Sequence, residues 1–255
     1  MSTQAGNPTN TYTVPSVSIK TAHTGATNKA NALGMRTMQE RAYAKRGEQY
    51  LLIKSPPASG KSRALMFIAL DKLNNQGLQQ AIVVVPERSI GSSFADEPLT
   101  QFGFYWDWQV SPQWNLCNAP GVDEARVAKS KVDAVRKFLN SDDKVLVCTH
   151  ATFRFAVEEL GIQSFDNRLI TVDEFHHVSS NPDSILGTQL TALIARDKTH
   201  LVAMTGSYFR GDSEAVLSPS DEAKFETVTY TYYEQLNGYT WLKSLDIGYF
   251  FYTGP

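Results

Sequence analysis

Glycine, lysine and serine stand next to one another at residues 60–62, at the end of a Ser-Pro-Pro-Ala-Ser-Gly-Lys-Ser segment that begins at Ser55. Gly60 lets the backbone approach a phosphate closely, and the Lys61 ammonium can reach the β- and γ-phosphates of a nucleotide. The Ser62 hydroxyl can ligate Mg²⁺. The segment follows the phosphate-loop pattern G-x-x-x-x-G-K-[ST], with serine in the first place, and it predicts ATP and Mg²⁺ as cofactors. The residues expected to bind the nucleotide are Pro57, Ala58, Ser59, Gly60, Lys61 and Ser62.

Two adjacent carboxylates, Asp173 and Glu174, follow the apolar run at residues 169–172. If that run is a strand of a parallel sheet, both side chains lie at the carboxyl edge, where ligands bind. Asp173 can then hold Mg²⁺, and Glu174 can orient and polarise the attacking water. An isolated Asp-Glu pair is usually a solvated turn. A buried strand before it and a phosphate loop upstream favour the catalytic interpretation, with Lys61 as the third catalytic group.

Short apolar runs alternate with amphipathic segments, which predicts βαβ units in an α/β fold with a mostly parallel central sheet and helices on both faces. A strand must deliver the phosphate loop, and a helix must leave it so that its free N–H groups face the phosphates. The strands are expected at residues 50–54, 81–85, 144–148, 169–172, 200–205 and 225–230. The helices are expected from residue 31 to about 47, and at 61–73, 123–139, 151–160, 184–196 and 233–244.

The first 30 residues are rich in Ser, Thr, Asn, Gln and Ala and contain few large apolar groups. They cannot bury enough surface to offset the entropy of ordering, so a flexible arm is expected over residues 1–30, with one strand near 11–19. A single domain is expected over residues 31–255.

Composition narrows the class of protein. The chain is 42% hydrophobic with a net charge of −2, so any nucleic-acid binding must use a local groove and not a global positive field. Its two cysteines, Cys117 and Cys148, have no metal-ligand spacing and suggest no disulfide framework. No apolar run approaches the length of a membrane span, and the N-terminus lacks a signal-peptide pattern. A cytoplasmic protein is therefore expected.

An aromatic cluster occupies the segment 102–114. It contains Phe104, Tyr105, Trp106, Trp108 and Trp114. Such rings can form a stacking surface for bases. We favour a packed insertion that covers the edge of the sheet, because no Lys or Arg is interleaved with the rings.

Taken together, the motifs resemble the first RecA-like domain of a superfamily-two helicase or translocase of the DEAD/DEAH-box kind. The run from Asp173 to His176 is similar to the D-E-x-H box, and Met204–Arg210 is similar to the third helicase motif. The latter is closest to the T-G-T-P-[FWY]-R form of type III restriction motor subunits. In such families this motif touches the D-E-x-H box and couples hydrolysis to movement. The resemblance therefore implies a link between His176, Thr205 and Ser207.

Three further segments carry the same resemblance. The Val-Val-Pro-Glu-Arg run that ends at Arg88 and the Cys-Thr-His run around Thr149 are similar to motifs that contact a nucleic-acid backbone. The Arg-Thr-Met-Gln run from Arg36 to Gln39 is similar to the R-x-x-Q element. There Gln39 would read the adenine edge, because an amide both donates and accepts hydrogen bonds.

The resemblance implies a RecA-like ATPase domain over residues 31–255, with the second RecA-like domain absent and the chain truncated. The leading hypothesis is the N-terminal half of a nucleic-acid helicase or translocase, acting on DNA more readily than RNA. A regulatory P-loop ATPase that never touches nucleic acid is a second hypothesis, and a degenerate domain kept for protein contact is a third. Ala58 and the Pro56-Pro57 pair depart from the family pattern. The two prolines remove two N–H donors from the loop, so nucleotide affinity is expected to be modest.

Overall fold

Runs of Val, Leu and Ile form the strands of a six-stranded sheet with the order β4-β3-β5-β6-β2-β7. Every neighbouring pair in this sheet is parallel, as the sequence predicts. Parallel strands whose faces are both covered need apolar side chains on both sides, which explains the continuous apolar runs. The strands are β2 (Tyr50–Lys54), β3 (Ala81–Val85), β4 (Val145–Thr149), β5 (Leu169–Val172), β6 (His200–Thr205) and β7 (Glu226–Thr229).

The computed structural model describes residues 16–20, 31–86, 92–117, 124–175, 185–206, 217–238 and 244–248. The chain divides into two compact units, Lys29–Gln235 and a smaller one made of Met1–Asn28 with Leu236–Pro255. The smaller unit contains an antiparallel pair, β1 (Ser16–Lys20) with β8 (Ser244–Gly248). Among the described helices, none combines the length and apolar character needed to cross a bilayer.

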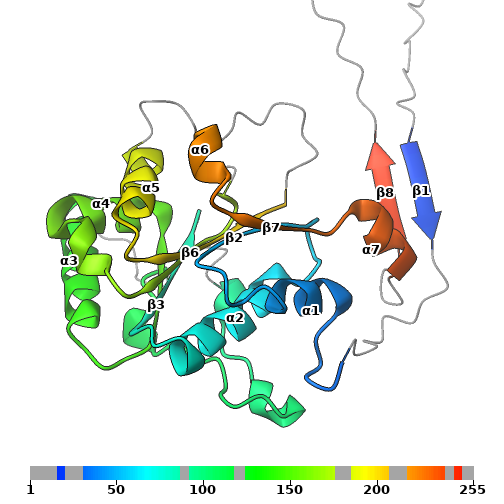
Figure 1. Ribbon diagram of the computed structural model, residues 1–255, viewed down its shortest axis with the longest axis horizontal. Coiled ribbons are helices and arrows are strands. Elements are labelled where there is room, and N and C mark those ends of the chain that lie inside the picture. Colours follow the sequence, from blue (N-terminus) through cyan, green and yellow to red (C-terminus); the bar gives the residue numbers. More distant parts are fainter. Residues whose placement is uncertain are drawn as a thin grey trace, which may run out of the picture. The chain divides into compact units, whose positions relative to one another are not determined.

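Helices cover both faces of the parallel sheet in the larger unit (Figure 1). On β2, Leu51 and Ile53 pack into one apolar cluster with the helices α1 and α2, whereas Tyr50 and Leu52 pack into another cluster on the opposite face. This alternation follows from the two-residue period of a strand. The helices are α1 (Thr37–Tyr43), α2 (Lys61–Asn75), α3 (Glu124–Leu139), α4 (His150–Leu160), α5 (Ile185–Arg196), α6 (Pro219–Glu222) and α7 (Tyr232–Gly238). Short 3₁₀ helices lie at Leu99–Phe102, Pro112–Trp114 and Ile162–Phe165.

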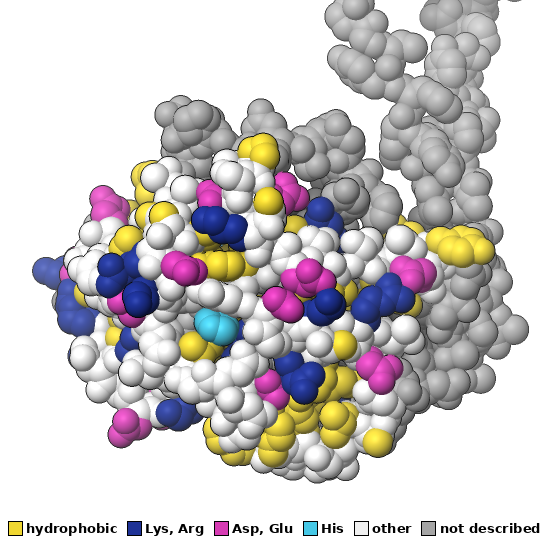
Figure 2. Space-filling view, in the orientation of Figure 1, with side chains coloured by type: hydrophobic (Ala, Val, Ile, Leu, Met, Phe, Trp, Pro, Cys, Tyr) yellow, Lys and Arg dark blue, Asp and Glu magenta, His cyan; other side chains and the backbone are white. Residues whose placement is uncertain are grey.

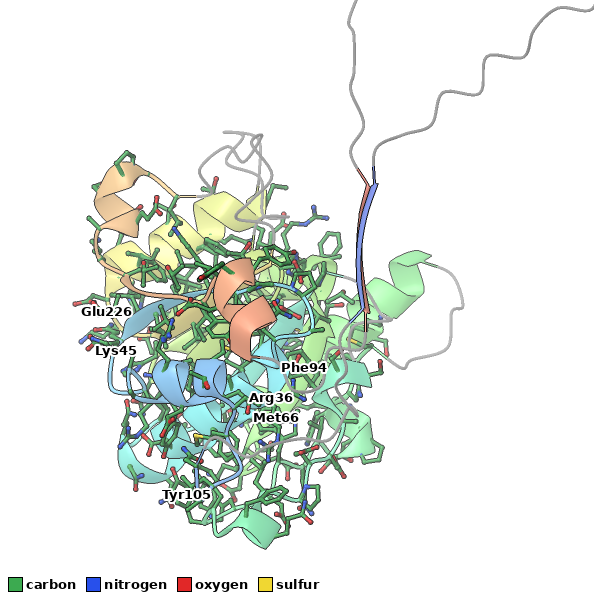
Figure 3. All side chains as sticks on the ribbon, turned by 90° about the vertical axis from the view of Figure 1, so that its right-hand side faces the viewer. Arg36, Lys45, Met66, Phe94, Tyr105 and Glu226 are labelled. Atoms are coloured by element: carbon green, nitrogen blue, oxygen red, sulfur yellow. The ribbon has the colours of Figure 1, made fainter. Side chains whose placement is uncertain are left out.

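The short helix α7 is fixed beside α1. Arg41 of α1 donates to the Thr229 carbonyl (2.7 Å) and pairs with Glu234 (2.7 Å). A second ion pair, Lys45 with Glu226 at 2.6 Å, joins the segment after α1 to the start of β7 (Figure 3). These contacts bring the chain that follows β7 close to the N-terminal part of the domain.

Most predicted elements occur where the pattern placed them, and β2, β3, β5 and β6 have the predicted bounds. Two helices differ. The first begins at Thr37 and not near residue 31, because the Asn31 side chain accepts the Leu33 and Met35 N–H groups and holds a turn there. The last ends at Gly238, and Ser244 begins a strand, so the prediction of a helix over 233–244 was too long.

The aromatic segment is a packed insertion, as favoured from the sequence. Phe104, Trp108 and Trp114 are buried, while Tyr105 and Trp106 are each a little over a third exposed. Directly after Trp114, the Leu116 N–H donates to the carbonyl of Val147 in the outer strand β4 (2.9 Å). The insertion therefore covers one edge of the sheet.

Candidate functional site

The phosphate loop joins β2 to α2 through left-handed backbone. Gly60 is the N-cap of α2 with φ +92°, and Ala58 has φ +60°. The positive φ favours glycine at residue 60, and a Cβ there would lie 2.5 Å from Nε2 of Gln39 and would displace that amide from the loop. The loop thus turns sharply into a fifteen-residue helix whose first N–H groups are available to an anion.

The Lys61 ammonium is folded onto the loop. It donates to the carbonyl oxygens of Ser55 and Pro56, each at 3.1 Å, and the residue is 9% exposed. Burial lowers the pKa of Lys61, and the nearby charges of Glu174 and Asp173 oppose that shift. Gly206, directly after β6, lies so close that a Cβ there would be 3.3 Å from Nζ. A phosphate would replace the two carbonyls as the partner of this ammonium.

Three other side chains donate hydrogen bonds to further carbonyls of the loop. The donors belong to α1, to its N-cap residue and to α7, and not to the loop itself. The bonds run from Arg36 Nη1 to Ala58 (3.4 Å), from Gln39 Nε2 to Gly60 (3.1 Å) and from Gln235 Nε2 to Pro57 (3.2 Å). The loop shape is therefore fixed by side chains that lie far apart in the sequence.

The carboxylate pair lies at the end of β5. Asp173 is 5% exposed, its N–H donates to the Val84 carbonyl (2.9 Å), and its carboxylate accepts the Glu174 N–H (2.9 Å). Burial, with a contribution from the negative charge of Glu174, raises the pKa of Asp173 to about 6. Glu174 has φ +50°, a left-handed conformation that is strained for a residue with a side chain.

One pocket of about 570 Å³ brings the two predicted motifs together. Lys61 and Ser62 line it from the start of α2, and Asp173 and Glu174 line it from the turn after β5. The opposite wall comes from residues 92–97, which the sequence did not indicate as part of a site. In that wall, Glu97 pairs with Arg63 of α2 (2.9 Å).

The donor set in this pocket fits a magnesium ion. A serine hydroxyl and an aspartate carboxylate are hard oxygen ligands, of the kind that Mg²⁺ takes together with waters and substrate phosphates. Ser62 and Asp173 would hold the ion, which would neutralise charge on the phosphates. A cation beside Asp173 would also favour its ionised form, against the effect of burial.

Of the predicted site residues outside the phosphate loop and the carboxylate pair, three have contacts that the structure describes and three do not. Gln39 is 1% exposed, and both ends of its amide contact protein: Oε1 accepts the Arg36 N–H (2.8 Å) and Nε2 holds Gly60. Thr149 is the N-cap of α4, where its hydroxyl accepts the Thr152 N–H (3.3 Å). The Thr205 carbonyl accepts the Ser55 N–H (3.0 Å), which places the start of the third motif against the loop. Arg88, His176 and Ser207 lie outside the described residues.

Two contacts at the site were missed from the sequence. His150 Nε2 donates to the Asp173 carbonyl (3.1 Å), and Gln235 holds Pro57 from a position 178 residues further along the chain. The motif that predicts a nucleic-acid contact for Thr149 also contains His150, so a signal for this residue was present in the sequence. Gln235 lies in an ordinary helical pattern that gives no signal of a contact with the loop.

Comparisons with known proteins show the family and the fold of the chain. The sequence profile described as DEAD/DEAH box helicase matches residues 36–211, more than half of the chain. The chain is 55% identical over 238 residues to "Putative ATP-dependent helicase YeeB" of Bacillus subtilis (strain 168), covering 93% of this chain and 39% of that protein. A crystal structure of DUF1998 helicase MrfA bound to DNA shares the fold, with a TM-score of 0.51 and 13% identity, over 85% of this chain and 32% of that one.

The chain thus spans well under half the length of either of these proteins. The profile match begins at Arg36, includes the phosphate loop and both carboxylates, and ends just after the third motif. The chain belongs to the DEAD/DEAH box helicase family.

Proposed function

We propose that this chain is the ATP-binding and ATP-hydrolysing half of a nucleic-acid helicase or translocase, with DNA as the favoured substrate. The observation that carries the proposal is the single pocket in which Lys61, Ser62, Asp173 and Glu174 meet. Phosphoryl transfer to water needs a cation for the β- and γ-phosphates, a metal held near them, and a group that orients the water. These residues supply each requirement from the start of α2 and from the turn after β5.

The chemistry assigns one role to each side chain. Lys61 would leave the carbonyls of Ser55 and Pro56 and bind the phosphates. Asp173 and Ser62 would hold the metal, whose positive charge helps to stabilise the transition state. Glu174 would accept a hydrogen bond from the water and direct it at the γ-phosphorus.

A nucleic-acid strand would use local contacts. On the face drawn in Figure 2, Lys and Arg side chains are interspersed with Asp and Glu side chains. The N-terminus of α4 at Thr149 offers backbone N–H groups at a helix start, which suit a phosphate. DNA is favoured because the third motif resembles that of DNA translocases, and because the solved helicase of similar fold is bound to DNA.

The experiment is a melting-temperature titration with Mg²⁺ and a non-hydrolysable ATP analogue. At about a hundredfold excess over Kd, the ligand should add about 2.7 kcal/mol to the free energy of unfolding. Lys61→Ala should remove almost all of that gain, because the charge facing the phosphates is lost. Lys144→Ala, which changes an exposed lysine at the other end of the sheet, is the matched control. A Lys61→Ala variant that keeps the wild-type shift would disprove the site.

A regulatory P-loop ATPase that does not touch nucleic acid remains the alternative. The two functions separate in one assay on the longer natural chain. Single-stranded DNA, added at low salt, should raise the ATPase rate if the chain is part of a motor. A rate that no DNA or RNA changes would favour the regulatory alternative.

A further inference from the structure

The imidazole of His150 reaches across the end of one strand to the turn that carries the two carboxylates. His150 begins α4 directly after β4, whereas Asp173 follows β5, and β3 lies between these two strands. Its Nε2 is 3.1 Å from the carbonyl oxygen of Asp173. A carbonyl oxygen can only accept, so the imidazole donates and carries a proton on Nε2. The side chain can span β3 because that strand ends at Val85.

The turn at Asp173 and Glu174 needs outside support. A left-handed φ such as the +50° of Glu174 is unfavourable for a residue with a side chain, so surrounding bonds must enforce it. Val84 fixes the N–H of Asp173, the Asp173 carboxylate fixes the N–H of Glu174, and His150 fixes the carbonyl between them. The first two bonds come from the strand pairing and from the turn itself. Of these three bonds, the third comes from a side chain of another element.

We propose that His150 is a positioning residue for ATP hydrolysis: by holding the Asp173 carbonyl, it fixes the turn that aims Glu174 at the attacking water. This inference rests on the proposed function, because the role of His150 is defined by that of Glu174. The described lining of the pocket does not include His150, so it acts through the turn and not on the nucleotide. A substitution of His150 should therefore change the rate of hydrolysis without changing nucleotide affinity, which depends on the loop.

Two amide variants test whether a donor at residue 150 must reach the Asp173 carbonyl. In His150→Gln the amide nitrogen can take the place of Nε2, whereas in His150→Asn it stops one methylene short. The rate of single-turnover ATP hydrolysis, with protein in excess, and the Kd for ADP with Mg²⁺ are measured for both. His150→Asn should lose about tenfold in rate, the factor expected when a buried carbonyl loses its donor. Its Kd should stay within about twofold of wild type, and His150→Gln should keep most of the rate.

The control removes a comparable bond from the same helix. Gln189 of α5 donates from Nε2 to the Arg154 carbonyl in α4 (3.0 Å) and is not among the residues that line the pocket. Gln189→Met should therefore leave the rate of hydrolysis at the wild-type value. A general loosening of α4 would instead slow Gln189→Met as much as His150→Asn, and would overturn the proposal.

Two other outcomes would also overturn it. The first is a wild-type rate for His150→Asn, and the second is an equal loss in both amide variants, since either shows that the reach of the donor is irrelevant. A wild-type chain that binds nucleotide but never hydrolyses it would remove the hydrolytic function and this inference with it. That result differs from failure of the inference alone, in which wild type turns over ATP and His150→Asn matches it.

Discussion

The buried polar groups at the two ends of the parallel sheet have different surroundings. At the amino end, the fully buried Lys72 ammonium donates to the Glu48 carbonyl (2.7 Å) and lies 2.9 Å from Nδ1 of His200. The amide nitrogen of Gln80, which has two N–H groups to donate, lies 2.7–3.1 Å from three main-chain carbonyl oxygens. Those carbonyls belong to Phe138, Ser141 and Asp143. The bonds of Lys72 tie α2 to the chain before β2 and to the start of β6, and those of Gln80 tie the chain before β3 to the end of α3. The buried polar groups at this end therefore stabilise the fold.

At the carboxyl end, the buried polar groups surround a space. Lys61 rests on two loop carbonyls that a phosphate can replace, and burial holds the pKa of Asp173 near 6. Non-glycine residues with left-handed backbone occur at both ends: Ala58 and Glu174 lie at the carboxyl end, and Asn167 and Asp197 lie at the amino end, where Asn and Asp tolerate that conformation more readily. We infer that buried polar groups stabilise the fold at the amino end and serve the proposed function at the carboxyl end. Variants at the amino end should change the free energy of unfolding, and variants at the carboxyl end should change binding or rate.

The largest effect is expected for Glu174→Gln. The amide keeps the size of the side chain but cannot polarise water, so turnover in the longer natural chain should fall by about 10²–10⁴-fold. The Kd for ATP with Mg²⁺ should change little, because Lys61 and the metal ligands remain. Steady-state ATPase rates and fluorescent-nucleotide titration measure the two quantities, with Glu222→Gln as an exposed control. Normal hydrolysis by Glu174→Gln would end its assignment.

At the opposite end, Lys72→Met should lower the free energy of unfolding by about 2–3 kcal/mol, because it leaves buried acceptors without their donor. Methionine keeps the length of the apolar stem, so little volume is lost. Urea unfolding gives the stability, and nucleotide Kd should be unchanged. The exposed Lys45→Met is the control and should hardly alter the urea midpoint. If Lys72→Met weakened nucleotide binding as strongly as Lys61→Ala, the separation of the two ends would be wrong.

A smaller effect concerns acid. Burial, and secondarily the charge of Lys72, lowers the pKa of His200 from 6.5 to about 4. As pH falls below 6.5, the unfolded chain takes up this proton first, so stability is lost progressively until about pH 4. Discounted for partial exposure, the loss is on the order of 1–2 kcal/mol.

The check for His200 is a comparison with His200→Asn, whose amide oxygen can accept from Lys72 but does not titrate. Urea midpoints are measured between pH 7 and pH 4. The wild-type curve should fall more steeply than that of the variant. Parallel curves would show that another group controls acid stability.

The smallest effect separates two roles of Gln39. Its bond to Gly60 should matter for every nucleotide, whereas the predicted reading of adenine should matter for ATP alone. Gln39→Ala should cost about 1 kcal/mol for GTP and about 1–2 kcal/mol for ATP. Gln235→Met removes a bond to the neighbouring Pro57 without any link to the base, so its losses should be equal. Equal losses in both variants would remove the adenine role.

Much of the fold was readable because its signals are local. The apolar runs at β2, β3, β5 and β6 have the predicted bounds, and the Gly-Lys-Ser run begins a helix as expected. The meeting of Lys61 with Glu174 was also predictable, since carboxyl ends of parallel strands share one edge.

The rest depends on contacts whose partners are far apart in sequence. Gln235 reaches the loop because β7 lies beside β2, and no periodicity in the sequence encodes that neighbour. The wall at residues 92–97 depends on the path of an irregular insertion. The turn at Asn31 shortened α1 because a side chain competed with the helix for N–H groups.

The insertion against β4 should lower the tendency of the protein to aggregate. An outer strand of sequence Val-Leu-Val-Cys-Thr offers a row of amide groups on which an unrelated strand could dock and begin a cross-β deposit. Leu116 occupies that row at Val147, and Trp114 anchors the cover by donating to the Asp143 carboxylate (2.6 Å). Truncations that remove this insertion while leaving the pocket intact should therefore make the protein precipitate when it is concentrated.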